Sequence, residues 1–456
     1  MEFVNLTRRQ EIGANSYLLR LGGKSVILDS GLHPKEEGFG ATPDFSLVPD
    51  GTVDSILVTH AHQDHIGSLP FLTRRHPEAA VLMTEGTHRI GDIMLHNSVN
   101  VMLRQREADK ILDYPLFTHR GVELSRQKWL RCPLNRPLAL NGERAAAGEE
   151  TTVEFYHAGH ILGSTGVLVR HEGRSLFYTG DVHFDDQTIM RRADFPTSGV
   201  DVLVMETTRG DSPTPAGFNR ADEETRFGQA VLDAFAQGSA VTIPVFALGK
   251  TQELLAMLWK LRHQGSLPST PIYIGGLSTK ITEVYDALAD VSNRSLADLQ
   301  LLQDLAPYVV SGNEISLLQP RKRCLFAISS GMMTEHTLSN LFARKILEDE
   351  SQHLFFVGYA DPESPAGRIR SAKRGDEVSL DENLPPLKLR CQVNQFNFSA
   401  HATRESLRDY AIALQPRKIL LVHGDAPAIA WFRRELAQAL PGTEVIAPEP
   451  GVALAL

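Results

Sequence analysis

The stretch His60-Ala-His-Gln-Asp-His65 places three imidazoles and one carboxylate within six residues. It follows an apolar run, residues 55–59, that is typical of a buried strand, so the four side chains are expected on the loop that leaves this strand. Imidazole and carboxylate groups are ligands that zinc accepts without thiolates. Four donors exceed what one tetrahedral ion usually takes from a short loop, so the stretch predicts two ions. A turn of unpaired histidines would instead desolvate several polar groups without compensation.

Acidic residues and histidines also stand at the ends of four other apolar runs. The strand ends of stacked α/β sheets form one rim, where ligands collect. A polar turn residue would explain any single case, but five strands that end in this way favour one site assembled from distant segments. These four runs end at Asp29, Asp181, Glu206 and His423.

The composition is that of an ordinary globular protein. The chain has 456 residues, 46 basic and 55 acidic side chains, and a formal net charge of −9. This length suits two or three domains. The negative net charge disfavours a protein that coats nucleic acid nonspecifically, although the net charge of the whole chain would not reveal a local basic cleft. Three scattered cysteines argue against a disulfide framework.

The sequence predicts no membrane segment and no signal peptide. No apolar run approaches the roughly 20 residues that cross a bilayer, and residues 1–10 lack a signal-peptide core. We therefore expect a cytoplasmic protein.

Strands and helices alternate along the chain, which favours parallel sheets over a sandwich of hairpins. A helix is expected after residues 240–245, with Leu254, Leu258 and Leu261 on one face, and another after residues 418–422. The expected strands are residues 26–28, 55–59, 153–156, 176–179, 202–205, 240–245, 271–274, 325–328, 354–357 and 418–422.

Seven motifs resemble those of the metallo-β-lactamase superfamily and, for the last three, its β-CASP branch of nucleases. That branch contains the ribonuclease J type enzymes and the endonuclease of messenger RNA 3′-end processing. The resemblance implies an α/β fold, an αββα sandwich with an inserted β-CASP cap domain built on a parallel sheet. Residues 1–206 and 396–456 would form the sandwich, and residues 207–395 the cap. The motifs are Leu28-Asp-Ser-Gly31, His60 to His65, His157-Ala-Gly-His160, Tyr178-Thr-Gly-Asp181, Met205-Glu206, Phe398-Ser-Ala-His401 and Leu421-Val-His423.

The resemblance also implies a metal site with two zinc ions. Asp29 would orient the loop and one ligand imidazole through hydrogen bonds. Asp181 would bridge the two ions. The remaining ligands would be His60, His62 and His160 for one ion and Asp64, His65 and His423 for the other.

His157 competes with His160 as the ligand from the third motif. We prefer His160, because Gly159 before it allows the backbone to turn and because the family places its ligand in the Gly-His pair. His33, His171 and His183 match no ligand position.

The chemistry that the resemblance implies is hydrolysis of a phosphodiester. Two zinc ions would lower the pKa of a bound water to about 7 and so provide a hydroxide. Glu206 and His401 are the candidates for protonating the leaving oxygen, since a carboxylate beside an imidazole keeps it protonated. Asp64 is the third residue assigned to catalysis. Single-stranded RNA is the expected substrate, cut internally, from the 5′ end, or in both ways.

Phosphate contacts are expected from the cap. Residues 330–332 follow a predicted strand and are expected to open a helix, whose free N–H groups suit a phosphate. The chain departs from the family pattern at Thr403, where an acidic residue is usual, although threonine can still cap the following helix. It also has a proline-rich loop at residues 358–368. The candidate phosphate contacts are Lys250, Ser330, Gly331, Arg368 and Ser399.

Three other hypotheses compete with an RNA nuclease. A DNA nuclease of the same branch would usually carry an aliphatic residue in place of His423. A thioesterase or lactonase would share the metal loop but would not need Glu206, His401 or the cap. A non-catalytic scaffold subunit would lack metal ligands, and none is missing here. RNA is therefore the expected partner, with a homodimer left open.

Overall fold

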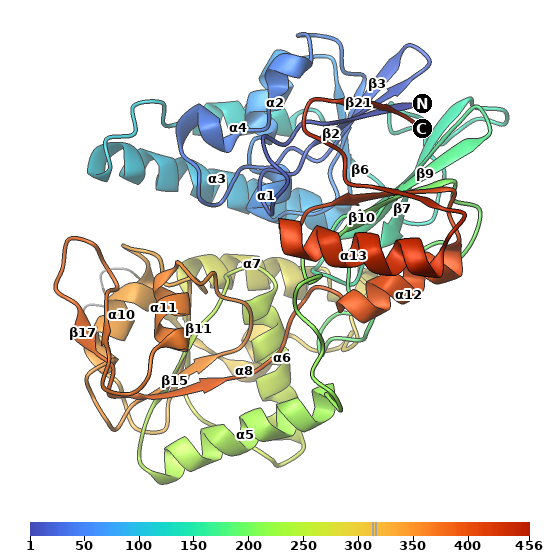
Figure 1. The fold of residues 1–456 in the computed structure, drawn as a ribbon. Coiled ribbons are helices and arrows are strands. Elements are labelled where there is room, and N and C mark those ends of the chain that lie inside the picture. Colours follow the sequence, from blue (N-terminus) through green and yellow to red (C-terminus); the bar gives the residue numbers. More distant parts are fainter. Residues whose placement is uncertain (312–313, 315–316) are drawn as a thin grey trace. The chain divides into compact units, whose positions relative to one another are not determined.

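Two compact units make up the fold of this computed structural model, which describes residues 1–311, 314 and 317–456 (Figure 1). The first unit consists of Met1–Asp186, Arg191–Thr214 and His401–Leu456. The second consists of Gln187–Met190 and Pro215–Ala400. Among the residues that the structure describes, no helix combines the length and the apolar character needed to cross a membrane.

The first unit contains two sheets. The first sheet has seven strands, which in spatial order are β21 (Ala453–Ala455), β1 (Glu2–Asn5), β2 (Tyr17–Leu21), β3 (Lys24–Leu28), β4 (Ser55–Leu57), β5 (Ala80–Met83) and β6 (Trp129–Arg131). The second sheet has six strands, which in spatial order are β20 (Glu444–Ile446), β19 (Lys418–Val422), β10 (Val202–Glu206), β9 (Arg174–Tyr178), β8 (Thr165–His171) and β7 (Thr151–His157).

The side chains of these strands alternate between two layers, because successive residues of a strand point to opposite faces. Val26 of β3 and Tyr178 of β9 belong to one core between the two sheets. Ile27 belongs to a second core with helices on the outer face of the first sheet, and Phe177 to a third with helices on the outer face of the second sheet. The layers therefore form an αββα sandwich. Its helices are α1 (Gln63–Ile66), α2 (Leu69–Arg75), α3 (Glu85–Ala108), α4 (His119–Arg126), α12 (Arg404–Leu414) and α13 (Ala426–Ala439).

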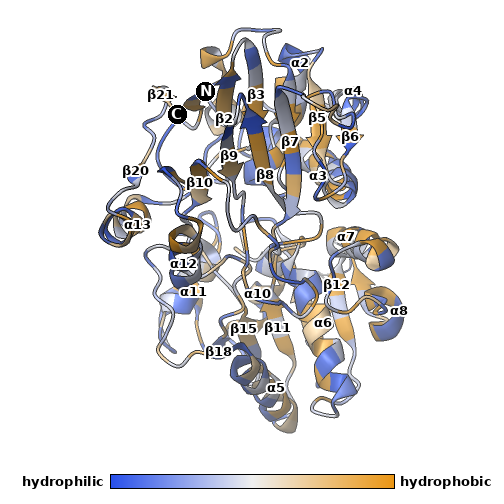
Figure 2. Ribbon diagram, turned by 90° about the vertical axis from the view of Figure 1, so that its right-hand side faces the viewer, coloured by the Kyte–Doolittle hydropathy of each residue, from blue (hydrophilic) through white to orange (hydrophobic). Residues whose placement is uncertain are grey.

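The second unit is built on a parallel sheet whose central strands are apolar, as their orange colour in Figure 2 shows. The predicted fold class, an αββα sandwich with an inserted parallel α/β unit, is confirmed. The strands of this sheet in spatial order are β13 (Tyr308–Val310), β12 (Ile272–Gly275), β14 (Leu325–Ile328), β11 (Val241–Pro244), β15 (His353–Phe356) and β18 (Gln392–Gln395). A small antiparallel pair comprises β16 (Glu377–Val378) and β17 (Leu387–Lys388). The helices are α5 (Arg220–Ala236), α6 (Lys250–His263), α7 (Gly276–Ala287), α8 (Leu301–Leu305), α10 (Leu338–Ile346) and α11 (Pro365–Ser371).

The segment after β14 differs from the prediction. Residues 330–332 do not open a helix; they form a turn, and α10 begins only at Leu338. The first turn of α10 holds this loop through its side chains. The Ser339 hydroxyl donates to the carbonyl oxygen of Ser330 at 2.7 Å, and the Asn340 amide donates to that of Met333 at 2.8 Å. These bonds stabilise a non-helical backbone that the local sequence pattern does not reveal.

Candidate metal centre

The carboxyl ends of parallel strands bring the candidate residues of the first unit together. In the second sheet, β9, β10 and β19 are parallel neighbours. Asp181, Glu206 and His423 stand at or just beyond their ends, so they lie at one edge. In the first sheet, β3 and β4 are parallel neighbours, followed by Asp29 and His60. The two edges meet, because His60 Nε2 lies 3.5 Å from Asp181 Oδ2.

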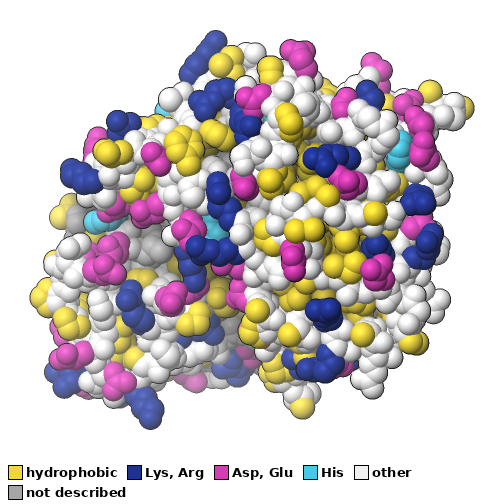
Figure 3. All heavy atoms as spheres, turned by 45° about the horizontal axis from the view of Figure 1, so that its top comes forward, with side chains coloured by type: hydrophobic (Ala, Val, Ile, Leu, Met, Phe, Trp, Pro, Cys, Tyr) yellow, Lys and Arg dark blue, Asp and Glu magenta, His cyan; other side chains and the backbone are white. Residues whose placement is uncertain are grey.

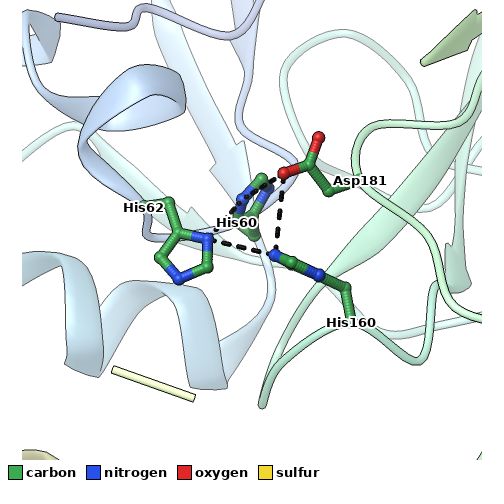
Figure 4. A group of neighbouring side chains, drawn as sticks. All are labelled: His60, His62, His160 and Asp181. Atoms are coloured by element: carbon green, nitrogen blue, oxygen red, sulfur yellow. Dashed lines mark hydrogen bonds and ion pairs between the residues drawn. The ribbon is translucent and has the colours of Figure 1, made fainter. Parts of the chain in front are cut away.

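Three histidines and one aspartate form the first cluster of possible ligands (Figure 4). His62 Nδ1 lies 3.1 Å from Nε2 of His60 and 3.1 Å from Nε2 of His160. Asp181 Oδ2 lies 3.6 Å from Nε2 of His160. All four ligand atoms fall within 4.8 Å of one another. Three imidazoles and a carboxylate at such spacing form a donor set that suits zinc.

The second cluster consists of Asp64, His65 and His423. Asp64 Oδ2 lies 3.2 Å from His423 Nε2 and 3.7 Å from His65 Nε2. The second oxygen of Asp181, Oδ1, lies 3.3 Å from His65 Nε2 and 2.9 Å from His423 Nδ1. Each carboxylate oxygen of Asp181 therefore faces a different cluster, which is the arrangement of a bridging ligand.

The surroundings of Asp181 fit a cation. Its Oδ1 atom is buried and accepts no hydrogen bond from the described residues, although two imidazole nitrogens lie close to it. Burial raises the pKa of Asp181, but His423 and His65 outweigh burial and hold this pKa well below its ordinary value. A buried carboxylate that stays ionised needs positive charge beside it. Two metal ions would supply this charge.

Burial and charge also perturb the histidines. Burial lowers the pKa of His60 well below its ordinary value, which favours the neutral imidazole that binds metal. Burial opposes the charge of His423 as well, but Asp181 and Asp64 outweigh it and raise the pKa of His423 to about 10. The centre therefore holds strong negative charge, which attracts cations.

Asp29 fixes the loop that carries His60 to His65 through hydrogen bonds. Its carboxylate accepts hydrogen bonds from the Thr59 backbone N–H at 2.7 Å and from the Tyr178 hydroxyl at 2.8 Å. His65 Nδ1 lies 2.7 Å from Asp29 Oδ2, which leaves Nε2 of the same ring directed toward Asp181. Strand β4 ends at Leu57, two residues earlier than predicted, and the Thr59 N–H donates to Asp29 rather than to a neighbouring strand.

Replacing Asp29 with asparagine is expected to weaken zinc binding by about 10- to 100-fold, because the carboxylate fixes the tautomer and orientation of His65. Competition with a chelator of known affinity measures this effect. The matched control is Asp201→Asn. Asp201 also accepts hydrogen bonds, from the backbone N–H and the hydroxyl of Ser175 in β9, but it belongs to none of the clusters of possible metal ligands among the described residues. Equal zinc affinity in wild type and Asp29→Asn would contradict the orienting role.

Two glycines allow the loops to approach closely. A Cβ atom at Gly31 would lie 1.9 Å from the carbonyl oxygen of Asp64. Gly159 has φ +72°, and a Cβ atom there would lie 2.6 Å from the carbonyl oxygen of His183. The turn at Gly159 brings His160 into the first cluster. His157 instead lies with Nε2 3.0 Å from the carbonyl oxygen of Arg191, and it belongs to none of the metal-type clusters in the described chain.

Glu206 and His401 form a pair beside the two clusters. His401 Nδ1 lies 3.3 Å from both carboxylate oxygens of Glu206, and its Nε2 lies 3.8 Å from Asp181 Oδ2. The Val182 backbone N–H donates to Glu206 Oε1 at 2.9 Å and fixes the carboxylate. Burial lowers the pKa of His401, but Glu206 and Asp181 outweigh it and raise this pKa above its ordinary value. Thr403 caps α12 as predicted, since its hydroxyl accepts from Ser406 N.

The candidate phosphate contacts lie in the second unit. Lys250 begins α6 and donates to the carbonyl oxygen of Phe398. Lys250 and Gly331 line one pocket, together with Phe246 and Tyr359. These two aromatic residues were not among the predicted contacts. A signal was present, because Phe246 lies two residues after the end of β11 and Tyr359 three residues after the end of β15. The other candidates are Ser330 after β14, Arg368 on α11 and Ser399 after β18.

Three family models match consecutive parts of the chain. The metallo-beta-lactamase superfamily matches residues 9–227. The Beta-Casp domain matches residues 251–369. The Zn-dependent metallo-hydrolase RNA specificity domain matches residues 386–448, which include His401 and His423.

Relatives with similar sequences cover nearly the whole chain. Cleavage and polyadenylation specificity factor subunit 3 of Dictyostelium discoideum is 28% identical over 467 residues, with 100% of this chain and 57% of the relative covered. Endoribonuclease YSH1 of Eremothecium gossypii is 26% identical over 457 residues, with 97% and 58% covered. The chain thus spans little more than half the length of these relatives.

One solved structure supports the fold alone. It is a protein of unknown function from Enterococcus faecalis, 13% identical, with a TM-score of 0.55 and 100% of both chains covered.

Proposed function

Because the chain belongs to the metallo-β-lactamase superfamily and to its β-CASP branch, we propose that it is a zinc-dependent ribonuclease that hydrolyses phosphodiester bonds of single-stranded RNA. The observation that carries this proposal is the Asp181 carboxylate, with one oxygen toward each ligand cluster and the Glu206–His401 pair beside it. The match to an RNA specificity domain and a relative named as an endoribonuclease support RNA as the substrate.

The proposed ligands divide between two ions. When bound, the zinc ions would lower the pKa of water and offset the charge of the phosphate. Asp29 keeps His65 oriented. Asp181 would offer one carboxylate oxygen to each site. The other ligands are His60, His62 and His160 for one ion and Asp64, His65 and His423 for the second.

His401 is the proposed general acid. Its Nδ1 atom stays with Glu206, so Nε2, which faces Asp181, is the atom that would carry the proton for the leaving oxygen. A leaving alkoxide needs that proton because it is a strong base. Glu206 acts through His401: its carboxylate holds the ring in place and stabilises the charged imidazolium.

The test is cleavage of labelled nucleic acid by the zinc-loaded chain. We expect single-stranded RNA to be cleaved faster than DNA of the same sequence, and binding to weaken steeply with salt if several phosphates are contacted. Sizing the products of internally labelled and 5′-labelled RNA separates internal cleavage from 5′-to-3′ degradation. An Asp64→Ala chain purified in parallel controls for contaminating ribonuclease.

Two outcomes would contradict the proposal. Equal rates on RNA and DNA would favour a nuclease without preference for RNA. Rapid turnover of a thioester or lactone, with no cleavage of RNA, would favour a small-substrate hydrolase. A cytoplasmic location and a homodimer stay predictions from the sequence.

A further inference from the structure

The parallel sheet of the second unit contains a topological switch point. Strands β11 and β15 are parallel neighbours. After β11 the chain continues through α6 to β12, toward one edge of the sheet. After β15 it continues through α11 to β18, at the opposite edge. Where connections diverge in this way, a crevice opens outside the carboxyl ends of the two strands, and ligands of α/β sheets bind in such crevices.

A pocket lies at this switch point, and aromatic side chains line it. Val245 and Phe246 follow β11, while Gly358 and Tyr359 follow closely on β15. Phe246 is 37% exposed and Tyr359 is 63% exposed. Large aromatic surfaces left in water beside a pocket are a feature of binding sites, because their burial is favourable once a ligand arrives.

Two glycines shape the pocket. A Cβ atom at Gly331 would lie 2.9 Å from two ring carbons of Phe246, so only glycine lets this ring lie against the loop after β14. A Cβ atom at Gly358 would lie 3.5 Å from Cε of Lys250. The end of the Lys250 side chain therefore lies close to the turn that carries Tyr359.

The charge of the pocket is positive. Among the lining residues within the described chain, Lys250 carries the one formal charge. Lys250 donates to the carbonyl oxygen of Phe398, and Arg370 donates to that of Gly358 at 2.9 Å. Both acceptors are neutral carbonyl groups. On the face drawn in Figure 3, basic and acidic side chains are interspersed, so that face offers no broad positive surface for a polyanion.

We propose that one nucleotide of a single-stranded RNA binds at the mouth of this small pocket, with the base against the exposed rings of Phe246 and Tyr359 and a phosphate at Lys250. The inference rests on the proposed ribonuclease function and adds a base-binding site in the cap. Aromatic rings beside a cation match a nucleotide, since every base has a π face and every phosphate a negative charge. Stacking of this kind tolerates sequence changes, so the site would anchor RNA without selecting one base.

The experiment uses the full zinc-loaded chain and a ten-nucleotide RNA with cleavage-resistant phosphorothioate linkages. The adenine analogue 2-aminopurine replaces one base at a time, and its fluorescence falls where it stacks. We expect Phe246→Ala and Tyr359→Ala to restore the fluorescence at the stacked position and to weaken binding by about 5- to 100-fold. Tyr359→Phe should bind like wild type, because it keeps the ring. Gly331→Ala should also weaken binding, because it displaces the Phe246 ring without removing it.

Tyr308→Ala is the matched control. Tyr308 is 58% exposed on β13, at the far edge of the same sheet, so its loss should leave RNA binding unchanged. On cleavable RNA, the Phe246 and Tyr359 variants should raise KM while kcat stays within about twofold. The thermal midpoint of Tyr359→Ala should match wild type, because exposed positions tolerate substitution, and the midpoint of Phe246→Ala is measured in parallel to verify that the fold is kept.

Two failures can be told apart. If the wild-type chain cleaves RNA while Phe246→Ala and Tyr359→Ala change neither KM nor fluorescence, the base site is wrong and the ribonuclease proposal stands. If the wild-type chain neither binds nor cleaves RNA, both proposals are wrong.

Discussion

Asp181→Asn is expected to lower bound zinc from two ions per chain to below one and to reduce RNA cleavage by more than about 100-fold. Asparagine keeps the volume of the side chain but offers neither the charge nor the second anionic oxygen, and Asp181 faces both ligand clusters at once. Loss of a group that merely orients a ligand typically costs 10- to 100-fold, so loss of a bridging ligand should cost more. Metal analysis of the purified chain and initial rates on labelled RNA measure the two effects.

Asp64→Ala separates bridging from ordinary ligation. Asp64 belongs to the second cluster alone, so this variant should keep close to one zinc ion per chain while Asp181→Asn keeps fewer. Asp201→Asn controls for the loss of a carboxylate elsewhere in the same unit and should keep both ions. Two zinc ions and a wild-type rate in Asp181→Asn would overturn the assignment of the bridge.

The sequence predicts the strands that carry the site because two patterns occur together there: a short apolar run and a polar residue at its end. Residues 325–328 and 418–422 are strands with the predicted bounds. The first is an unbroken buried apolar run, and the second has four buried apolar residues after Lys418. A polar residue after such a run lies at the sheet edge whatever the rest of the fold does. Hence Asp181 and His423 could be expected near one another before any coordinates were known.

Other features depend on partners that are distant in the sequence. Strand β21 has three residues, two of them exposed, and exists because it pairs with β1 at the opposite end of the chain. The loop at residues 330–337 is held by side chains of α10, so a helix predicted from local signals was wrong. Phe246 and Tyr359 come together only because β11 and β15 are neighbours, and spacing along the sequence carries no trace of that pairing.

His401→Ala is expected to keep both zinc ions while cleavage falls by about 10²- to 10⁴-fold, the usual cost of a missing general acid. His401 lies with Asp181 and Glu206 in a third cluster that could itself hold a metal ion, so zinc content is the deciding measurement. Glu206→Gln should lower the rate in the same direction, because the neutral amide stabilises the imidazolium less than the carboxylate does. The double variant should be little slower than the slower single variant, since the two residues act as one unit.

The leaving group of the substrate tests the role of His401 directly. In a phosphodiester of p-nitrophenol, the p-nitrophenolate leaves without needing a proton. On this substrate, His401→Ala should therefore recover much of its lost rate relative to wild type. Asp64→Ala should recover nothing, because no leaving group replaces a metal ligand. A structural role for His401 would instead slow both substrates equally. If His401→Ala loses one zinc ion, then His401 is a ligand, the third cluster is a metal site, and the proton must come from another group.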